Sequence, residues 1–457
     1  MFAKETYIHR RDALKRSIGS GILLFLGNEE VGMNYADNTY HFRQDSTFLY
    51  FFGLNYAGLS AIIDIDNDRE IIFGNELTID DIVWMGTQPT LKEKAHSIGI
   101  DETQPVSRLK KYLEDALEKG QTIHYLPVYR AEHAVKLSGL LGIRMGVQYP
   151  SVPFIRSVVS LRNHKTEEEI AELERACDVT ADMHITAIRT AQVGMKEYEV
   201  AAALEAVAQA NGCLISFPTI TTVNGQTLHN HFHGNTIKEG DMVLIDAGAE
   251  TPMGYCGDMS STVCAGRRFS TRQREIYDIQ VEAHLAAVRA LRPGIPFSDV
   301  YDLSCRTICE GLKGLGLIKV DPAEAVAAGA HAMFFPCGLG HMMGLDVHDM
   351  ENLGEVWVGY DGQPKSTQFG RKSLRLARPL EPGFVLTVEP GIYFIPELID
   401  LWKSEGRFKD FINYSKVETF KDFGGIRNEE DYLITETGAR RLGKKIPLTA
   451  EEVEAMR

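Results

Sequence analysis

The sequence predicts an α+β protein of two domains, the first of mixed α/β character. Its 457 residues exceed the ~100–200 residues of a typical domain. In the first part, strand-like runs at residues 21–26, 60–65 and 70–73 lie between helical stretches. One of these helical stretches spans residues 106–119. In the rest, long amphipathic helices alternate with antiparallel-looking strands. We therefore expect one domain over residues 1–160 and a second over residues 161–457.

Local signals place the helices of the second domain. Two prolines within residues 149–153 indicate the approach to a boundary. Thr166 and Glu169 form a capping box that opens a helix to about Ala191. Further helices are predicted at residues 196–210, 271–291 and 297–315, and a short final helix that begins after Thr449.

Composition limits the possible partners. There are 63 acidic and 48 basic side chains, for a formal charge of −15, and no basic block. This excess argues against nucleic acid or an anionic membrane as the main partner.

The start lacks the apolar core of a signal peptide, and the most apolar run, residues 22–26, is far shorter than the ~20 residues that span a bilayer. The seven cysteines include no CxxC pair. These features predict a reduced, cytoplasmic protein.

Two aspartates mark the first candidate site. Asp246 ends an apolar run, residues 242–245, that is typical of a buried strand. A buried carboxylate is costly unless a cation or hydrogen-bond donors meet it. Asp258 follows after a turn-like segment at 251–254. If the two flanking segments form a hairpin, the aspartates face each other across it; a turn or capping role for Asp258 is the alternative.

Two later segments repeat this pattern of a strand that ends in a carboxylate. Glu389 ends an apolar run and precedes Pro-Gly, and Arg427 and Glu429 share a strand face by period-two alternation. His341 stands among glycines that allow close backbone approach. Four crowded carboxylates repel one another unless cations neutralise them, and two divalent ions would balance their charge. Oxygen ligands with one imidazole and no thiolate fit Mn²⁺, Co²⁺, Fe²⁺ or Zn²⁺.

These residues and their motifs resemble a known family. Asp246, Asp258, His341, Glu389 and Glu429 are similar, in that order, to the ligand set of the pita-bread metallopeptidases. The segments LGH at 339–341, GLDVHD at 344–349 and LTVEPGIY at 386–393 resemble the branch of aminopeptidase P and prolidase. The segments 43–46 and 48–53 resemble the creatinase-like N-terminal domain of that branch. The resemblance implies a pita-bread catalytic domain preceded by an α/β creatinase-like domain.

The resemblance also implies roles for the metal-site residues. Asp246 would chelate one ion, Asp258 and Glu429 would bridge two ions, and His341 and Glu389 would hold the other. Mn²⁺ is the first expectation, with Co²⁺, Zn²⁺ and Fe²⁺ as alternatives. A hydroxide between the ions would attack the scissile carbonyl. Glu389 would also move the proton of that water towards the leaving nitrogen.

Further residues match substrate positions of the family. His229 matches a histidine near the substrate, and His348 matches one that helps to stabilise the tetrahedral intermediate. Arg427 matches the arginine that orients the adjoining carboxylates, and we group it with the substrate-binding residues. Arg375 looks like the prolidase arginine that grips the carboxylate of a dipeptide. Its alternative is an ordinary surface arginine.

These features favour prolidase, an Xaa-Pro dipeptidase, within the branch. The long segment 394–424 between the two glutamates and the segment IVWMG at 82–86 are also similar to prolidase. The expected partners are short proline-containing peptides and further copies of the chain, as a homodimer or a higher oligomer. The main alternative is an Xaa-Pro aminopeptidase that releases the first residue of longer Xaa-Pro peptides.

Some features depart from this interpretation or leave others open. Asp246 and Asp258 are twelve residues apart where the family usually has eleven, which implies one extra residue in the hairpin turn. Cys337 stands where many relatives carry a histidine, and a nucleophilic Cys337 is less favoured than a substituted pocket residue. His229, His231 and His233 could share a strand face and form a separate zinc site. A catalytically inactive module or a metal-free creatinase-type hydrolase would generally lack the acidic ligands, which are all present here.

Overall fold

The protein divides into two compact units. The computed structural model describes residues 1–144 and 149–457. One unit comprises Met1–Arg162 with Met350–Trp357, and the other comprises Asn163–Asp349 with Val358–Arg457. Among the described residues, no helix combines the length and the apolar character needed to cross a membrane.

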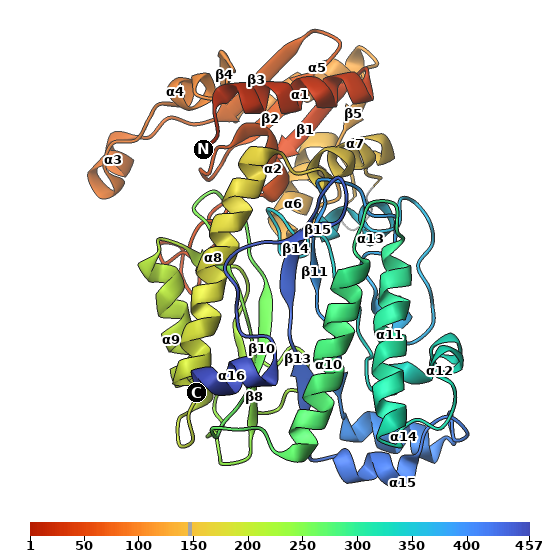
Figure 1. Ribbon diagram of the computed structural model, residues 1–457. Helices are drawn as coiled ribbons and strands as arrows, with labels where there is room; N and C mark the ends of the chain where they lie inside the picture. Colours follow the sequence, from red (N-terminus) through yellow and green to blue (C-terminus); the bar gives the residue numbers. More distant parts are fainter. Residues whose placement is uncertain (145–148) are drawn as a thin grey trace. The chain divides into compact units, whose positions relative to one another are not determined.

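A five-stranded mixed sheet forms the centre of the first unit (Figure 1). Its order is β4-β3-β2-β1-β5, with bounds Glu102–Pro105, Arg69–Gly74, Ser60–Asp64, Ile22–Leu26 and Ile123–His124. β1 and β2 are antiparallel, and β1 and β5 are parallel. Alternating apolar residues of the strands, such as Ile22 and Leu24, pack with Leu109 and Leu113 of helix α5 (Arg108–Glu118). The expected strands and the expected helix near residues 106–119 are confirmed.

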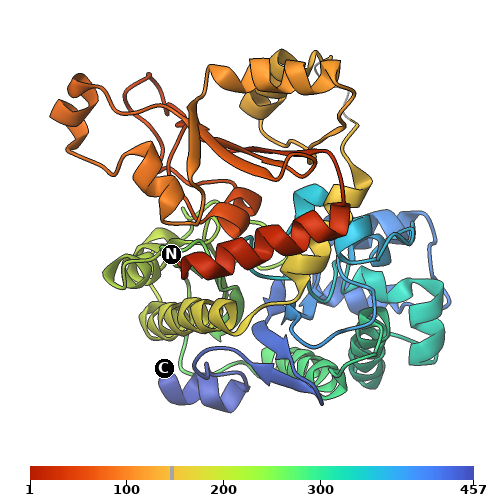
Figure 2. The ribbon, with the colours of Figure 1, turned by 90° about the horizontal axis from the view of Figure 1, so that it is seen from above.

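The helices of this part of the chain are α1 (Lys4–Ile18), α2 (Ser46–Phe52), α3 (Ile79–Met85), α4 (Leu91–His96), α5 (Arg108–Glu118), α6 (Ala131–Leu141) and α7 (Val152–Asn163). Figure 2 shows α3 at the end of a long excursion, away from the sheet of this unit. None of the residues of α3 is buried. The segment IVWMG noted in the sequence therefore forms an exposed helix and its C-terminal glycine.

Long helices cover one side of the second unit (Figure 1). Helix α8 (Glu167–Thr190) packs with α9 (Glu197–Ala210), and α10 (Thr271–Ala290) packs with α11 (Phe297–Gly314). The Thr166 capping box is present: the side chain of Thr166 accepts from the N–H of Glu169, and the Glu169 side chain accepts from that of Thr166. A capping box at Thr449 likewise opens the final helix, α16 (Ala450–Met456). These predicted helix starts are confirmed.

The strands of the second unit pair antiparallel and carry the candidate site. The order β10-β8-β7 comprises Met259–Cys264, Met242–Ala247 and Ile220–Thr222, and the order β11-β14-β15 comprises Val385–Val388, Glu430–Ile434 and Ala439–Arg441. Two pairs complete the set: β12 (Gly391–Tyr393) with β13 (Gly425–Arg427), and β6 (Leu214–Ile215) with β9 (Ala249–Glu250). Antiparallel strands beside long helices confirm the predicted α+β class.

Short helices fill the connections. They are α12 (Pro322–Ala328), α13 (Glu355–Val358), α14 (Pro396–Ser404), α15 (Tyr414–Val417) and the 3₁₀ helices η1 (Ala330–Met333), η2 (Glu351–Leu353), η3 (Arg371–Ser373) and η4 (Glu418–Phe420). The segment between Glu389 and Glu429 thus contains ordered helices with an aromatic core of its own, in which Phe394 stacks on Phe420 at 4.8 Å between ring centroids.

Candidate active site

The hairpin of β8 and β10 brings Asp246 and Asp258 to one face. Asp246 pairs with Ser260, and the same register continues to Thr251, whose N–H donates to the carbonyl of Tyr255 at 2.9 Å. The twelve-residue spacing between Asp246 and Asp258 is therefore accommodated in the hairpin turn, without a β-bulge in either strand. Asp258 lies two residues before Ser260, so it is diagonal to Asp246 on the shared face. The predicted hairpin is present, and the two aspartates share one face of it as diagonal neighbours, with Ser260 opposite Asp246.

Carboxylates and one imidazole converge at this hairpin. Ligand atoms of Asp258, His341 and Glu429 all lie within 4.8 Å of one another. The Nε2 atom of His341 is 3.3 Å from Oδ2 of Asp258 and 3.6 Å from Oε1 of Glu389. His341 Nδ1 lies 3.1 Å from the carbonyl of Met342. A proton on Nδ1 satisfies that carbonyl and leaves the Nε2 lone pair directed at the carboxylates.

Glu389 and Glu429 both lie next to the ends of strands. Glu389 follows β11, and its backbone N–H donates to the carbonyl of Leu339 at 2.7 Å, which ties it to the segment that holds His341. Glu429 lies in the break between β13 and β14 and forms an isolated bridge with Ser260. Ser260 Oγ donates to Oε2 of Glu429 at 2.7 Å. The sequence did not single out Ser260, although it faces the same side as Asp258 by period-two alternation.

Arg427 orients the neighbouring groups. Its Nη2 donates to Oδ2 of Asp246 at 2.5 Å, Nη1 to the hydroxyl of Tyr393 at 2.9 Å, and Nε to Oγ of Ser260 at 2.9 Å. Because Ser260 in turn holds Glu429, one guanidinium fixes two candidate ligands. These contacts agree with the orienting role that the resemblance implies, and a direct contact of Arg427 with substrate stays a prediction.

The electrostatics of the cluster suit bound cations. Burial, then repulsion from Asp246, raises the pKa of Asp258 to about 8, and burial raises the pKa of Glu389 to about 7. Burial and the neighbouring carboxylates raise the pKa of Glu429 well above its ordinary value. Without metal the cluster therefore retains protons that divalent ions can replace. Oδ1 of Asp246 is buried and has no hydrogen-bond partner among the described residues, as expected of a ligand atom left for a cation.

The predicted substrate residues lie near the same cluster. The rings of His341 and His348 are 4.3 Å apart at an interplanar angle of 65°. Partial burial, followed by the charge of Arg427, lowers the pKa of His229, and Asp246 and His348 also act on it. The charge of Arg375 lowers the pKa of His341, after the dominant effect of burial. His348 therefore contacts a residue of the cluster, and the charges on His229 and Arg375 are close enough for electrostatic interaction with it.

Two neighbouring arginines form ion pairs with acidic side chains. Arg371 forms a two-pronged ion pair with Asp302, with N–O distances of 2.8 and 2.7 Å. Arg378 pairs with Glu381 at 2.7 Å. Within residues 1–144 and 149–457, Asp258, His341 and Glu429 form the one group with metal-ligand spacing, so His229, His231 and His233 do not form the separate zinc site that alternation allowed.

A buried ion pair supports the loop of His348. Lys165 Nζ lies 2.9 Å from Oδ2 of Asp349, the residue after His348, and both side chains are 1% exposed. Oδ1 of Asp349 accepts from the N–H of Asp346 at 3.3 Å. This pair could not be predicted from the sequence, because a lysine between two helices carries no local sign of a partner 184 positions away.

Asp431 is a further residue that the sequence did not single out. Its Oδ2 accepts from the backbone N–H of Asp258 at 3.1 Å and from the thiol of Cys177 at 3.1 Å. Burial and the charge of Asp258 raise its pKa well above the ordinary value. Asp431 continues the alternation of Arg427 and Glu429, a signal that could have identified it.

Cys337 does not have the properties of a nucleophile. Burial, then the charge of Glu389, raises the pKa of its thiol to about 12. A thiol with such a pKa carries almost no thiolate near neutral pH. Cys337 therefore fits the interpretation of a substituted pocket residue.

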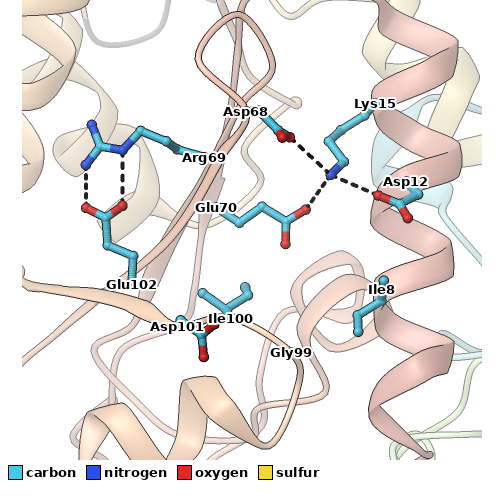
Figure 3. Close-up of a pocket in the computed structure, with 10 residues that line it drawn as sticks. All are labelled: Ile8, Asp12, Lys15, Asp68, Arg69, Glu70, Gly99, Ile100, Asp101 and Glu102. Carbon is cyan, nitrogen blue, oxygen red and sulfur yellow. Dashed lines mark hydrogen bonds and ion pairs between the residues drawn. The ribbon is translucent and has the colours of Figure 1, made fainter.

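A pocket of about 380 Å³ lies elsewhere, in the first unit (Figure 3). Its charged side chains pair with one another: Lys15 lies 2.9 Å from Asp12 and 3.0 Å from Glu70, and Arg69 pairs with Glu102 (Figure 3). Five acidic and two basic side chains line this pocket, so these ion pairs balance only part of its negative charge, and we assign it no catalytic role.

Comparison with known proteins decides the family. The model of metallopeptidase family M24 matches residues 171–436, which include every candidate ligand. The chain belongs to metallopeptidase family M24. The model of the aminopeptidase P N-terminal domain matches residues 7–124, which agrees with the predicted two-domain architecture of an M24 enzyme.

Individual M24 relatives match over nearly the whole chain. Xaa-Pro dipeptidase of Homo sapiens is 30% identical over 451 residues, which cover 95% of this chain and 88% of the relative. Xaa-Pro aminopeptidase of Escherichia coli is 31% identical over 471 residues, which cover 99% and 98%. These matches confirm the resemblance to the aminopeptidase P and prolidase branch of M24.

Solved structures of M24 enzymes have the same fold. Aminopeptidase P from E. coli with the inhibitor Pro-Leu gives a TM-score of 0.81 at 29% identity and covers 100% of this chain and 98% of that one. Proline aminopeptidase P II from Yersinia pestis gives a TM-score of 0.82 at 28% identity, with coverage of 100% and 99%.

Proposed function

We propose that this protein hydrolyses the Xaa-Pro peptide bond with two divalent metal ions, and that its main substrates are Xaa-Pro dipeptides. The observation that carries the proposal is the convergence of Asp258, His341 and Glu429 within 4.8 Å, in a chain 30% identical to an Xaa-Pro dipeptidase. The buried, unpartnered Oδ1 of Asp246 and the raised pKa of Glu389 support the same centre.

Five residues would hold the metal: Asp246, Asp258, His341, Glu389 and Glu429. When bound, the ions supply Lewis acidity for the scissile carbonyl and lower the pKa of a nucleophilic water. Mn²⁺ is our first expectation, and Co²⁺, Zn²⁺ and Fe²⁺ suit the same oxygen-rich ligand set. Arg427 would keep Asp246 and, through Ser260, Glu429 in place during the reaction.

Protons and substrate groups would be handled by four side chains. We assign Glu389 to taking a proton from the nucleophilic water and giving it to the leaving nitrogen. That nitrogen belongs to proline and has no N–H of its own. We assign His348 to hydrogen bonding with the oxyanion, His229 to contact with the substrate, and Arg375 to the carboxylate of the dipeptide.

An Xaa-Pro aminopeptidase is the second candidate function. The near-complete coverage of the E. coli aminopeptidase and the TM-score of 0.82 to the Yersinia pestis enzyme favour it. Comparing kcat/KM for Ala-Pro and Ala-Pro-Ala distinguishes the two. We expect faster hydrolysis of Ala-Pro because Arg375 would grip its carboxylate, whereas clear preference for the tripeptide would establish the aminopeptidase.

We also propose a homo-oligomer, a dimer or larger, in the cytoplasm. The oligomer rests on the resemblance to the aminopeptidase P and prolidase branch, and light scattering would measure its mass. All seven cysteines are free, as expected in a reducing compartment. A stable monomer in solution would contradict the first statement.

A further inference from the structure

One buried side chain holds both ends of the loop that carries His229. This loop, residues 223–235, follows β7 directly. The backbone N–H of Val223 donates to Oε1 of Glu197 at 2.8 Å, and the backbone N–H of Asn235 donates to Oε2 at 3.0 Å. The side-chain amide of Asn235 also donates to Oε1, at 3.1 Å. The Glu197 carboxylate therefore binds the first and the last residue of the loop.

Because Glu197 is buried, its carboxylate needs hydrogen-bond donors from the protein. Glu197 is 0% exposed, although it is an acidic residue. Burying a carboxylate is costly unless hydrogen-bond donors replace the lost water. The three N–H groups supply those donors, and they must stay in place for the carboxylate to remain satisfied. The loop ends and the carboxylate thus fix one another.

Helix α9 does not require Glu197 for its own capping. Glu199, two residues further along, performs that role, since its Oε2 accepts from the backbone N–H of Lys196 at 2.7 Å. The backbone N–H groups of Glu197 and Tyr198 donate to the carbonyls of Asn235 and His233, both at 3.1 Å. The first residues of α9 therefore hydrogen-bond to the loop, whereas the exposed Glu199 caps the N-terminus of the helix.

We propose that Glu197 is a positioning residue that fixes the 223–235 loop and thereby places His229 beside the candidate metal centre. The inference rests on the proposed function, in which His229 contacts the substrate. It gives a role to a buried carboxylate that accepts three hydrogen bonds from the ends of this loop. It also predicts that a change at Glu197 acts through His229.

Glu197→Gln tests this proposal, with Glu199→Gln as the matched control. Glutamine keeps the shape, but its amide NH₂ replaces one acceptor and faces an N–H of the loop. We expect amide hydrogen exchange across residues 223–235 to become about tenfold faster, while the later turns of α9 stay protected. We expect kcat/KM for Ala-Pro to fall about tenfold with unchanged metal content. Glu199→Gln should change neither quantity.

A double-mutant cycle with His229→Ala separates positioning from general damage. If Glu197 acts through His229, adding Glu197→Gln to His229→Ala lowers kcat/KM no further. An equal loss in both backgrounds would overturn the proposal. Should Glu197→Gln not fold, Asn235→Ala removes one of the three donors and should show the same dependence on His229. If the wild type hydrolyses no Xaa-Pro peptide, the proposed function fails; the exchange measurement still decides whether Glu197 holds the loop, and unchanged exchange would overturn that.

Discussion

Arg427 donates a hydrogen bond of 2.5 Å to Oδ2 of Asp246, while Oδ1 of the same carboxylate is buried without a partner among the described residues. One oxygen is thus fixed by the protein and the other is left for a cation. An outer hydrogen bond of this kind orients a ligand and tunes its affinity. The relationship explains why an arginine, with its planar fork, stands beside a group of acids.

Arg427→Lys should therefore weaken metal binding. Lysine keeps the positive charge but cannot reach Ser260, Tyr393 and Asp246 together. Loss of such an orienting partner typically costs about 10–100-fold in metal affinity or activity, and metal titration with calorimetry would measure it. The matched control is Arg289→Lys, at an exposed ion pair with Glu282, which should have no effect. Equal affinities in both variants would contradict the orienting role.

The stability of the metal-free protein should fall as the pH rises from about 7 to about 8. Burial raises the pKa of Asp258 to about 8 and that of Glu389 to about 7. In this range the folded state keeps protons that the unfolded chain has lost, so the free energy of unfolding decreases with pH. Burial lowers the pKa of His341, which is therefore neutral in the folded state and almost neutral in the unfolded chain above pH 7.

Thermal unfolding after metal removal, at pH values across this interval, would test the sign. Asp258→Asn removes one titrating group and should reduce the slope. Because metal replaces the retained protons, affinity for Mn²⁺ should rise with pH and binding should release protons. A metal-free wild type that became more stable towards pH 8 would refute the electrostatic description of the cluster.

Arg375→Ala should raise KM for dipeptides and spare the metal. The charge of Arg375 acts on His341, whereas Arg378 is paired with Glu381. A charge-assisted contact with a carboxylate contributes about 1.5–3 kcal/mol, which corresponds to roughly 10–100-fold in KM. Steady-state kinetics on Ala-Pro, with Arg378→Ala as control, would measure the effect. An unchanged KM would return Arg375 to the status of a surface arginine.

Lys165→Met should destabilise the protein strongly. Lys165 and Asp349 are each 1% exposed, and methionine would leave the buried Asp349 carboxylate without this cation. Breaking such a buried pair costs about 3–5 kcal/mol, measurable by denaturant unfolding. Lys403→Met, which removes an exposed pair with Glu418, should cost at most about 1 kcal/mol. If the two variants lost equal stability, the buried pair would have no special role.

Much of the candidate site could be predicted because its signals are local. An apolar run ending in Asp246, a turn, and alternation around Asp258 specify a hairpin, and the structure contains it. The capping box at Thr166 fixed the start of α8 for the same reason. The residue that lies opposite Asp246 was harder to predict, because the register of the hairpin depends on the length and type of its turn.

Other residues could not be found because their partners are distant in the sequence. Ser260 bonds Glu429 across 169 positions, and Asp431 bonds Asp258 across 173 positions. A serine or an aspartate in a strand carries no local mark of such a contact. Glu197 resembles an ordinary first-turn glutamate, and only the folded loop shows that its carboxylate is used elsewhere.

Metal removal tests the central claim most directly. The protein would be dialysed against a chelator, its metal content measured, and its hydrolysis of Ala-Pro followed before and after Mn²⁺ is restored. We expect activity to fall at least ~100-fold without metal and to return as two ions bind per chain. Hydrolysis that continued unchanged in the metal-free protein would contradict the account.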